Sequence, residues 1–353
     1  MELLMYRWFI LLCLFFPLLT QADAPGDVID GARLYARHCA ACHGMRGDGG
    51  VGVPLRLPDF QAGVSDAYFE RTIRLGRPGR VMPAFRDLDD VEVSAIIRHV
   101  RSWAVTDAPP HDATPVRGDV KRGAGLFAKH CAVCHGAQGE GGAGTGVTFS
   151  RPRDLPVIAP ALNNPGFLTA ASDRMIRDTV ARGRAGTPMV SFREQGFSEQ
   201  DLDDVVAYMR SFGERPYDVP IDASDEPATL VFDSPHDLVT TVEALVRAAE
   251  GRNFRHIRTQ TLEEGLWPEG EDDPHQVVVY FCNFEFLNRA LQVDPRVGLF
   301  LPCRVTAVER DGRVQVLAIN PKRLSSHYNN RELNRMCEEM YGLYVEIIEE
   351  ATL

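Results

Sequence analysis

Two five-residue stretches of the sequence combine two cysteines and a histidine at the same spacing. They are Cys39-Ala40-Ala41-Cys42-His43 and Cys131-Ala132-Val133-Cys134-His135. In each stretch the two thiols lie one helical turn apart, so both can add to the vinyl groups of one porphyrin. The adjacent histidine, His43 or His135, then lies under the iron as its proximal ligand. The pattern therefore predicts two covalently bound haem c groups, each held by both cysteines of its stretch.

Other sites that use Cys-x-x-Cys units fit this sequence less well. A zinc ribbon pairs two such units at a spacing of about 15–20 residues, whereas these two units are 92 residues apart (131 − 39). A thioredoxin-like redox site needs neither the adjacent histidine nor the same flanking sequence twice. Haem attachment is therefore the interpretation that we favour.

A methionine is the candidate sixth ligand of each iron. Met82 and Met189 each lie beside a proline, in loops at residues 76–85 and 183–192 that both begin Gly-Arg. A thioether ligand favours ferrous iron and raises its potential, although a lone methionine more often packs in a core. The matched positions favour ligation, with Met175 and Met209 as alternatives in the second copy.

Two further pairs of residues are candidates for supporting roles. Arg77 and Arg184 follow the first glycine of each methionine loop. Each could hold a haem propionate through two hydrogen bonds, or could be a solvated surface arginine. The carbonyl groups of Pro58 and Pro160 are candidate acceptors for the second nitrogen of each proximal imidazole.

The segments that must position these residues also occur twice. Residues 31–38 and 123–130 predict helices leading into the haem motifs, with Tyr35 and Phe127 four residues before the first cysteine. Middle helices are expected at 66–75 and 173–181, and closing helices at 89–103 and 198–212. The offset grows from 92 residues at the haem motifs to 107 at the methionine loops (183 − 76). The second copy therefore carries 15 extra residues, which we expect between residues 139 and 160.

Taken together, these motifs resemble class I c-type cytochromes across residues 28–212. The resemblance implies two all-α domains, each with a low-spin, His/Met-ligated haem that passes single electrons. It is closest to the tandem dihaem arrangement of electron carriers and dehydrogenase subunits. We expect domains at 25–107 and 117–216, joined by a Pro-rich linker at 108–116.

The N-terminus has the features of a secretory signal at residues 1–24. Arg7 precedes an apolar run at 8–19, and Ala22-Asp23-Ala24 fits a cleavage site, so Cys13 would be lost. An uncleaved membrane anchor is the alternative, although the run is shorter than the roughly 20 residues of a spanning helix. Because the resemblance implies haem attachment outside the cytoplasm, we expect a periplasmic protein with no stable transmembrane segment after cleavage.

A different pattern begins at about residue 229, after a second linker at 217–228. Apolar strands are expected at 230–232, 277–282, 303–308 and 314–319, with helices at 238–249 and 330–350. Residues 229–353 therefore form an α/β or α+β domain. Cys282-Asn283, Leu301-Pro302-Cys303 and the acid-rich final helix resemble a small bacterial α/β family of unknown function. That resemblance implies a compact domain that can form a homodimer, but no established activity.

This last domain contains three cysteines, Cys282, Cys303 and Cys337. In an oxidising compartment two of them can form a disulfide and leave the third free; simple buried thiols are an alternative. A sharper hypothesis makes Cys282 and Cys303 a sulfur site. One thiol would then hold a sulfane or sulfite group whose electrons leave through the haems.

The negative charge of the chain is concentrated in the same domain. The formal net charge of the whole chain is −11, and residues 217–353 carry 24 acidic and 13 basic side chains against 23 and 24 in residues 25–216. An acidic surface does not favour nucleic acid and could dock a basic redox protein. It could equally serve only solubility.

The sequence therefore predicts a periplasmic dihaem cytochrome c that relays single electrons between redox proteins, such as a donor dehydrogenase and a terminal oxidase or reductase. The C-terminal domain would serve docking, dimerisation or substrate binding. The alternative is an oxidoreductase whose cysteine-containing C-terminal domain oxidises a small compound, such as a sulfur compound, and passes the electrons to both haems. No carboxylate dyad, nucleophile elbow, phosphate loop or zinc signature indicates a hydrolase or transferase.

Overall fold

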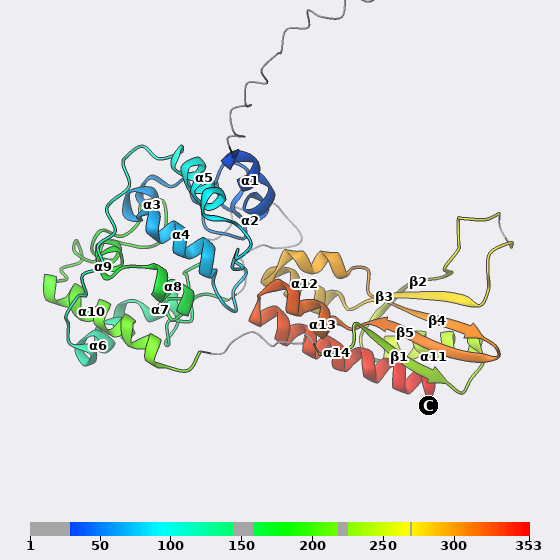
Figure 1. Ribbon diagram of the computed structural model, residues 1–353. Coiled ribbons are helices and arrows are strands. Elements are labelled where there is room, and N and C mark those ends of the chain that lie inside the picture. The colour runs from blue at the N-terminus through cyan, green and yellow to red at the C-terminus, as the bar shows by residue number, and fades with distance from the viewer. Residues whose placement is uncertain (1–28, 144–157, 218–224, 269) are drawn as a thin grey trace, which may run out of the picture. The chain divides into compact units, whose positions relative to one another are not determined.

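The computed structural model describes residues 29–143, 158–217, 225–268 and 270–353 (Figure 1). The predicted signal peptide at 1–24, with Cys13, lies outside the described residues. So does most of the loop in which the 15 extra residues are expected, because residues 144–157 are not described.

The two predicted all-α domains have the same helices in the same order. The first contains α1 (Gly31–His38), α2 (Ala40–His43), α3 (Pro58–Gly63), α4 (Asp66–Leu75) and α5 (Asp90–Arg101). The second contains α6 (Val120–His130), α7 (Ala132–His135), α8 (Pro165–Ala170), α9 (Asp173–Arg182) and α10 (Glu199–Ser211), followed by the short η1 (Phe212–Glu214). The predicted all-α fold is confirmed, and the predicted helix positions agree within a few residues.

Local sequence explains where the closing helices start. Asp89 caps α5 and Ser198 caps α10, and in both cases the acidic residue three positions later accepts a hydrogen bond from the cap backbone in return. Each reciprocal pair satisfies two N–H groups that would otherwise lack a partner at the helix start. The box predicted at Ser198 and Asp201 is therefore present.

Glycine lets the first and last helix of each domain cross closely. An added Cβ at Gly31 would lie 2.1 Å from the carbonyl oxygen of Ala95, and one at Gly123 would lie 2.0 Å from that of Asp204. Aromatic rings pack at the other end of each crossing, with ring centroids 5.1 Å apart for Tyr35 and Trp103 and 5.5 Å apart for Phe127 and Phe212.

The two domains contact each other through exchanged partners. Helix α4 packs against α8, and α3 packs against α9, although α3 is the counterpart of α8 and α4 that of α9. The methionine-loop arginines follow the same exchange. The guanidinium of Arg77 lies 5.9 Å from the ring centroid of Phe167, and that of Arg184 lies 4.9 Å from Phe60. Both methionine loops therefore start at the boundary between the domains.

The C-terminal domain is built on one antiparallel sheet with the order β1-β5-β4-β3-β2. Its strands are β1 (Thr229–Ser234), β2 (Arg255–Thr261), β3 (Gln276–Cys282), β4 (Arg304–Arg310) and β5 (Arg313–Ile319). Helices α11 (Leu238–Gly251) and α14 (Arg331–Thr352) pack against each other and along the sheet (Figure 1). The predicted α+β unit is thereby confirmed. The Asp311-Gly312 turn between β4 and β5 has positive φ at both residues, 52° and 71°.

Several smaller elements of this domain were not predicted. They are β2, α12 (Phe284–Val293), η2 (Pro295–Phe300), α13 (Pro321–Ser325) and η3 (Ser326–Tyr328). Strand β2 is an edge strand whose residues are exposed or only partly buried, so it has no apolar alternation to reveal it. Across the described part of the chain, no helix combines the length and apolar character needed to cross a membrane.

Candidate functional site

A short helical turn holds the two cysteines and the histidine of each predicted haem motif. The backbone N–H of His43 donates to the carbonyl of Cys39 at 3.0 Å, and His135 donates to Cys131 at 2.9 Å. Each turn ends in a glycine with positive φ, Gly44 at 77° and Gly136 at 78°. The chain therefore presents both thiols and the imidazole from one turn, as covalent haem attachment requires.

Both proximal imidazoles are oriented by a backbone carbonyl. The Nδ1 atom of His43 lies 2.8 Å from the carbonyl oxygen of Val53, and Nδ1 of His135 lies 3.0 Å from that of Pro160. When Nδ1 carries the proton and donates it, Nε2 keeps its lone pair for iron. Burial also lowers the pKa of both histidines, which favours the neutral ligand form.

Of the two carbonyl groups predicted to accept a hydrogen bond from an imidazole, one is confirmed. Pro160 has the expected role, but Pro58 does not, because Pro58 is the first residue of α3 and Val53 supplies the carbonyl instead. Val53 and Pro160 are 107 residues apart (160 − 53), and Pro58 matches Pro165 at the start of α8 at the same offset. The extra residues of the second copy therefore precede Pro160.

The two methionine loops are closed by the same backbone hydrogen bond. The N–H of Arg77 donates to the carbonyl of Met82 at 2.9 Å, and the N–H of Arg184 donates to that of Met189 at 2.8 Å. The glycine before each arginine has positive φ, and a Cβ on Gly76 would lie 2.5 Å from the next turn of the loop. Met82 and Met189 are both partly buried.

The alternative methionines of the second domain occupy core positions instead. Met209 is buried on α10, and Met175 on α9 packs against the same core. Both are held by helices, whereas Met189 lies in a loop that matches the Met82 loop. Met189 packs against this core too, from its loop, and its match to Met82 is what makes it the expected ligand.

The two arginines beside these loops contact the protein differently. Arg77 donates to the carbonyl of Gly76 at 2.9 Å and to the side-chain oxygens of Tyr68 and Thr72 at 3.1 and 3.0 Å. Arg184 has one long side-chain hydrogen bond, 3.5 Å to Thr179. Burial lowers the pKa of Arg184, and the negative charge of Asp59 offsets part of this effect. An acidic group such as a propionate would compensate this partly buried cation.

The residues present fit a covalently bound haem in each all-α domain. Each domain has two thiols and an imidazole on one turn, with Nδ1 of the imidazole at a backbone carbonyl, and a methionine on a glycine-dependent loop. A His/Met pair of axial ligands is typical of electron-transfer cytochromes.

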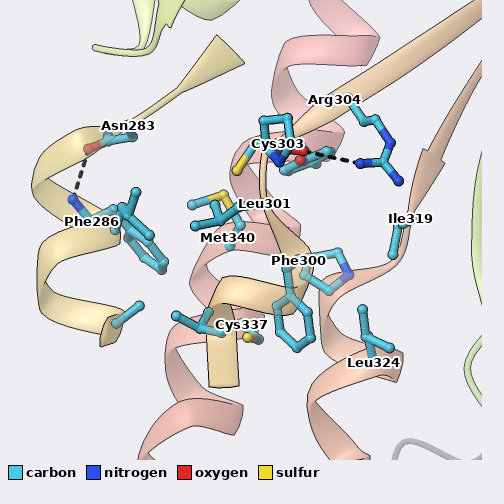
Figure 2. A pocket seen from close by; sticks show the side chains of 16 residues that line it. Asn283, Phe286, Phe300, Leu301, Cys303, Arg304, Ile319, Leu324, Cys337 and Met340 are labelled. Atoms are coloured by element: carbon cyan, nitrogen blue, oxygen red, sulfur yellow. Dashed lines mark hydrogen bonds between the residues drawn. The ribbon is translucent and has the colours of Figure 1, made fainter. Parts of the chain in front are cut away.

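The C-terminal domain contains a small apolar pocket lined partly by sulfur-containing side chains (Figure 2). Its cavity volume is about 60 Å³, enough for a molecule of a few heavy atoms. Cys303, at the start of β4, lines it together with Cys337 and Met340 of α14. Figure 2 shows Phe286 of α12 and Phe300 of η2 among the apolar walls.

In the structure no disulfide joins Cys282, Cys303 and Cys337, and a hydrogen bond links the side chains of Cys282 and Cys303. Cys282 is the last residue of β3, and Cys303 directly precedes the neighbouring strand β4. The N–H of Phe281 donates to the carbonyl of Cys303 at 3.1 Å. Hydrogen bonding from Cys282, together with the hydroxyl of Tyr344, lowers the pKa of Cys303 despite its burial. The same hydrogen bond, with burial, raises the pKa of Cys282. Burial raises the pKa of Cys337 to about 12.

One side chain with a role near a haem site was missed from the sequence. Asn329, between η3 and α14, makes hydrogen bonds to the loop that carries Met82. A single asparagine 247 residues from its partner (329 − 82) belongs to no motif, so no sequence pattern could have identified it.

Three protein families match successive parts of this chain. Residues 26–100 match cytochrome C oxidase, cbb3-type, subunit III, and residues 120–213 match cytochrome c. Residues 230–351 match domain of unknown function DUF302. The chain therefore consists of two cytochrome c domains followed by a DUF302 domain, and cytochrome c domains imply one covalently bound haem c in each.

Relatives with curated names align with the cytochrome part. The cbb3-type cytochrome c oxidase subunit FixP of Azorhizobium caulinodans is 35% identical over 133 residues, which are 35% of this chain and 42% of the relative. Subunit CcoP of Azospirillum sp. (strain B510) is 30% identical over 177 residues, 46% of this chain and 56% of the relative. The chain thus spans about half the length of the curated relatives that it matches.

A solved structure aligns with the C-terminal domain. It is an uncharacterized conserved DUF302 protein from Bacillus stearothermophilus, 20% identical, with a TM-score of 0.33. The alignment covers 35% of this chain and 98% of that protein.

Proposed function

We propose that this chain is an exported dihaem cytochrome c that relays single electrons between redox proteins in the periplasm. The observation that carries the proposal is a haem site built twice from the same parts. In each copy a carbonyl orients the proximal imidazole, and the same backbone bond closes a methionine loop. Its similarity to subunits named as parts of cbb3-type oxidases supports partners in a respiratory chain.

The proposed ligands follow from this geometry. Cys39 and Cys42 would hold haem 1, with His43 and Met82 on its iron; Cys131 and Cys134 would hold haem 2, with His135 and Met189 on its iron. When bound, each haem supplies one-electron uptake and release at its iron. Val53 and Pro160 would orient the two imidazoles through their carbonyl groups, and Met82 and Met189 would occupy the sixth positions and so disfavour binding of small molecules.

Arg77 and Arg184 are the proposed contacts of the haem propionates. Arg184 is the stronger candidate, because its partly buried guanidinium has a single, long side-chain hydrogen bond among the described residues and lies over the ring of Phe60. Arg77 already bonds Tyr68 and Thr72, so a propionate would share a guanidinium that is held in place.

Carbon monoxide binding to the dithionite-reduced protein tests the ligand assignment. We expect the wild-type protein to bind none, because both sixth positions are filled. Met82→Ala and Met189→Ala should each bind one equivalent per chain, seen as half of the haem absorbance change of the double variant. Met175→Ala is the matched control and should bind none. Carbon monoxide binding by the wild-type protein would contradict an electron-carrier assignment and indicate an open haem.

The C-terminal pocket favours a second candidate function, in which this domain oxidises a small sulfur compound and feeds the haems. The supporting observation is Cys303, a thiol with a lowered pKa that lines an apolar cavity of about 60 Å³. Joining the Cys303 thiolate to sulfite would form an S–S bond and release two electrons, one for each of the two proposed ferric haems; water would then release sulfate and restore the thiolate.

Anaerobic mixing of the oxidised protein with sulfite, thiosulfate and other small reductants tests this second candidate. Haem absorbance reports electron arrival. If the pocket is a substrate site, one compound should reduce the haems of the wild-type protein and of Cys337→Ser, but reduce those of Cys303→Ser far more slowly. Equal rates in all three proteins would leave the C-terminal domain with a binding role only.

A further inference from the structure

One asparagine of the C-terminal domain contacts the Met82 loop at four backbone positions. The Nδ2 atom of Asn329 lies 3.2 Å from the carbonyl oxygen of Arg77, 2.7 Å from that of Arg80 and 2.8 Å from that of Met82. Its Oδ1 atom accepts a hydrogen bond from the N–H of Gly79 at 3.2 Å. The amide has two N–H bonds for three carbonyls, so at least one is shared. A single side chain thus satisfies both donors and acceptors along the loop.

The backbone beside Asn329 adds to this contact. The N–H of Arg331 donates to the carbonyl of Gly79 at 3.0 Å. On the opposite side of the loop, the carbonyl of Pro78 accepts from Nδ2 of Asn164 and from the hydroxyl of Tyr217, both at 2.8 Å. The loop is therefore held from the second cytochrome domain, from the linker and from the C-terminal domain.

Asn329 is itself held in place by its own domain. It has the left-handed conformation, φ 47° and ψ 38°, which asparagine tolerates better than most residues. The carbonyl of the preceding Tyr328 accepts from Nη2 of Arg296 at 2.8 Å. The amide of the following Asn330 donates to the buried carboxylate of Asp294 at 3.2 Å. Contacts of the residues on both sides of Asn329 therefore hold its backbone in place within the C-terminal domain.

The Met189 loop is an internal comparison, because it has the same closing bond but a different neighbour. Its Ala185 N–H donates to the carboxylate of Asp59 in the first cytochrome domain at 2.6 Å. Within the described residues, the hydrogen bonds from the C-terminal domain to a methionine loop all go to the Met82 loop. The two proposed haem sites therefore differ in this contact.

We propose that Asn329 is a positioning residue for the sixth ligand of haem 1, through which the C-terminal domain sets the properties of that haem and leaves haem 2 unaffected. By holding the carbonyl of Met82 and three neighbouring positions, it restricts the loop to conformations in which the thioether stays on the iron. This inference rests on the proposed ligation of haem 1 by Met82, which the carbon monoxide test of Met82→Ala examines independently.

Imidazole titration of the ferric full-length protein tests the proposal, because imidazole competes with the methionine for iron. Asn329→Asp keeps the shape and backbone preference but loses the N–H donors, and Asn329→Gly removes the side chain without adding charge. Both should bind imidazole roughly tenfold more tightly at one haem per chain, the effect of losing one to two hydrogen bonds. The potential of that haem should fall, because a weaker methionine bond favours ferric iron.

Two controls identify the haem and separate positioning from general damage. The haem with the changed imidazole affinity must be the same haem that becomes able to bind carbon monoxide in Met82→Ala. Asn253→Gly changes another asparagine of the same domain with positive φ, 63°, and should leave both haems unchanged. Unchanged imidazole affinity and potential in both Asn329 variants would overturn the proposal, as would equal changes at the two haems.

Discussion

At the scale of single residues, two cysteines of the C-terminal domain, Cys303 and Cys337, have surroundings that shift their pKa values in opposite directions. Cys303 lines the pocket and its thiolate accepts hydrogen bonds from Cys282 and Tyr344, whereas Cys337 is buried with a pKa raised to about 12. A lowered pKa means that the thiolate form is present at lower pH. The two cysteines should therefore react at different rates with the same reagent.

We predict that iodoacetamide alkylates Cys303 before Cys337 near neutral pH, and that Cys282→Ala slows the reaction at Cys303. Removing the thiol that donates to Cys303 raises the pKa of Cys303, so the midpoint of its alkylation moves to higher pH. One hydrogen bond of about 1 kcal/mol corresponds to roughly fivefold fewer thiolates. Peptide mass spectrometry across a pH series measures both rates. Equal rates at Cys303 and Cys337 in the wild-type protein would contradict the assigned environments.

Arg184 is our proposed contact for a propionate of haem 2. Its guanidinium is partly buried over Phe60 and has one long hydrogen bond. We predict that Arg184→Gln lowers the potential of haem 2, because removing a nearby positive charge favours ferric iron. A change of about 1 kcal/mol, or roughly 40 mV for one electron, is expected from such a charge. Arg182→Gln, an exposed arginine at the end of α9, is the control in the same potentiometric titration and should shift neither haem.

Residue types and spacing predicted that each Cys-x-x-Cys-His motif lies on one turn, but not every contact around it. The motif alone is enough to predict this arrangement, because the two thiols and the imidazole come from neighbouring residues of one turn. The carbonyl group that accepts from the His43 imidazole could not be predicted. Every residue has a carbonyl, and only the loop geometry selects that of Val53 over that of Pro58. Asn329 was missed for the same reason, because its partners are backbone atoms of a distant loop.

At the scale of elements, each cytochrome domain depends on the crossing of its first and last helices. Gly123 on α6 lies against the backbone of α10, where an added Cβ would be 2.0 Å from the carbonyl oxygen of Asp204. Gly125 lies on the same helix with nothing within 4 Å of an added Cβ. The two glycines therefore separate the effect of the helix crossing from that of helix propensity.

We predict opposite effects of alanine at these two positions. Gly123→Ala should destabilise the second domain by about 2–3 kcal/mol, because backbone atoms of α10 must move to admit the methyl group. Gly125→Ala should stabilise it by about 0.5–1 kcal/mol, because alanine favours the helix. Denaturant unfolding of the haem-loaded protein, followed by circular dichroism, measures both. Equal stabilities of the two variants would show that the crossing is less close than the structure indicates.

The elements that were predicted from the sequence are those whose apolar residues recur at a regular helical or strand spacing. Helices α5 and α10 combine a capping box with an apolar face, and β5 alternates buried and exposed residues. Edge strand β2 and the short η2 lack such a period, because long-range packing rather than local pattern determines them. The unpredicted α12 and η2 line the pocket, and the unpredicted η3 precedes Asn329, so this part of the site was not predictable either.

At the scale of the whole molecule, charge separates the C-terminal domain from the cytochrome domains. Residues 217–353 carry 24 acidic and 13 basic side chains, whereas residues 25–216 are nearly neutral. The segment between β2 and β3 contributes exposed Glu264 and Glu271. A concentrated negative field accelerates the approach of a positively charged partner, and salt screens this effect.

We predict that electron exchange with a small basic redox protein slows as salt is added, by about tenfold between low and physiological ionic strength. If the segment between β2 and β3 guides docking, Glu264→Lys with Glu271→Lys should slow the exchange at low salt. Glu243→Lys with Glu250→Lys on α11 makes the same change in net charge at another exposed surface and should slow it less. Stopped-flow haem absorbance measures the second-order rate.

Equal slowing of electron exchange in both double variants would indicate attraction by net charge alone. No slowing in either variant would leave the acidic surface with a role in solubility. Because Asn329 links this acidic domain to the Met82 loop, localised docking would bring a partner to the domain that holds the loop of the proposed haem 1 ligand.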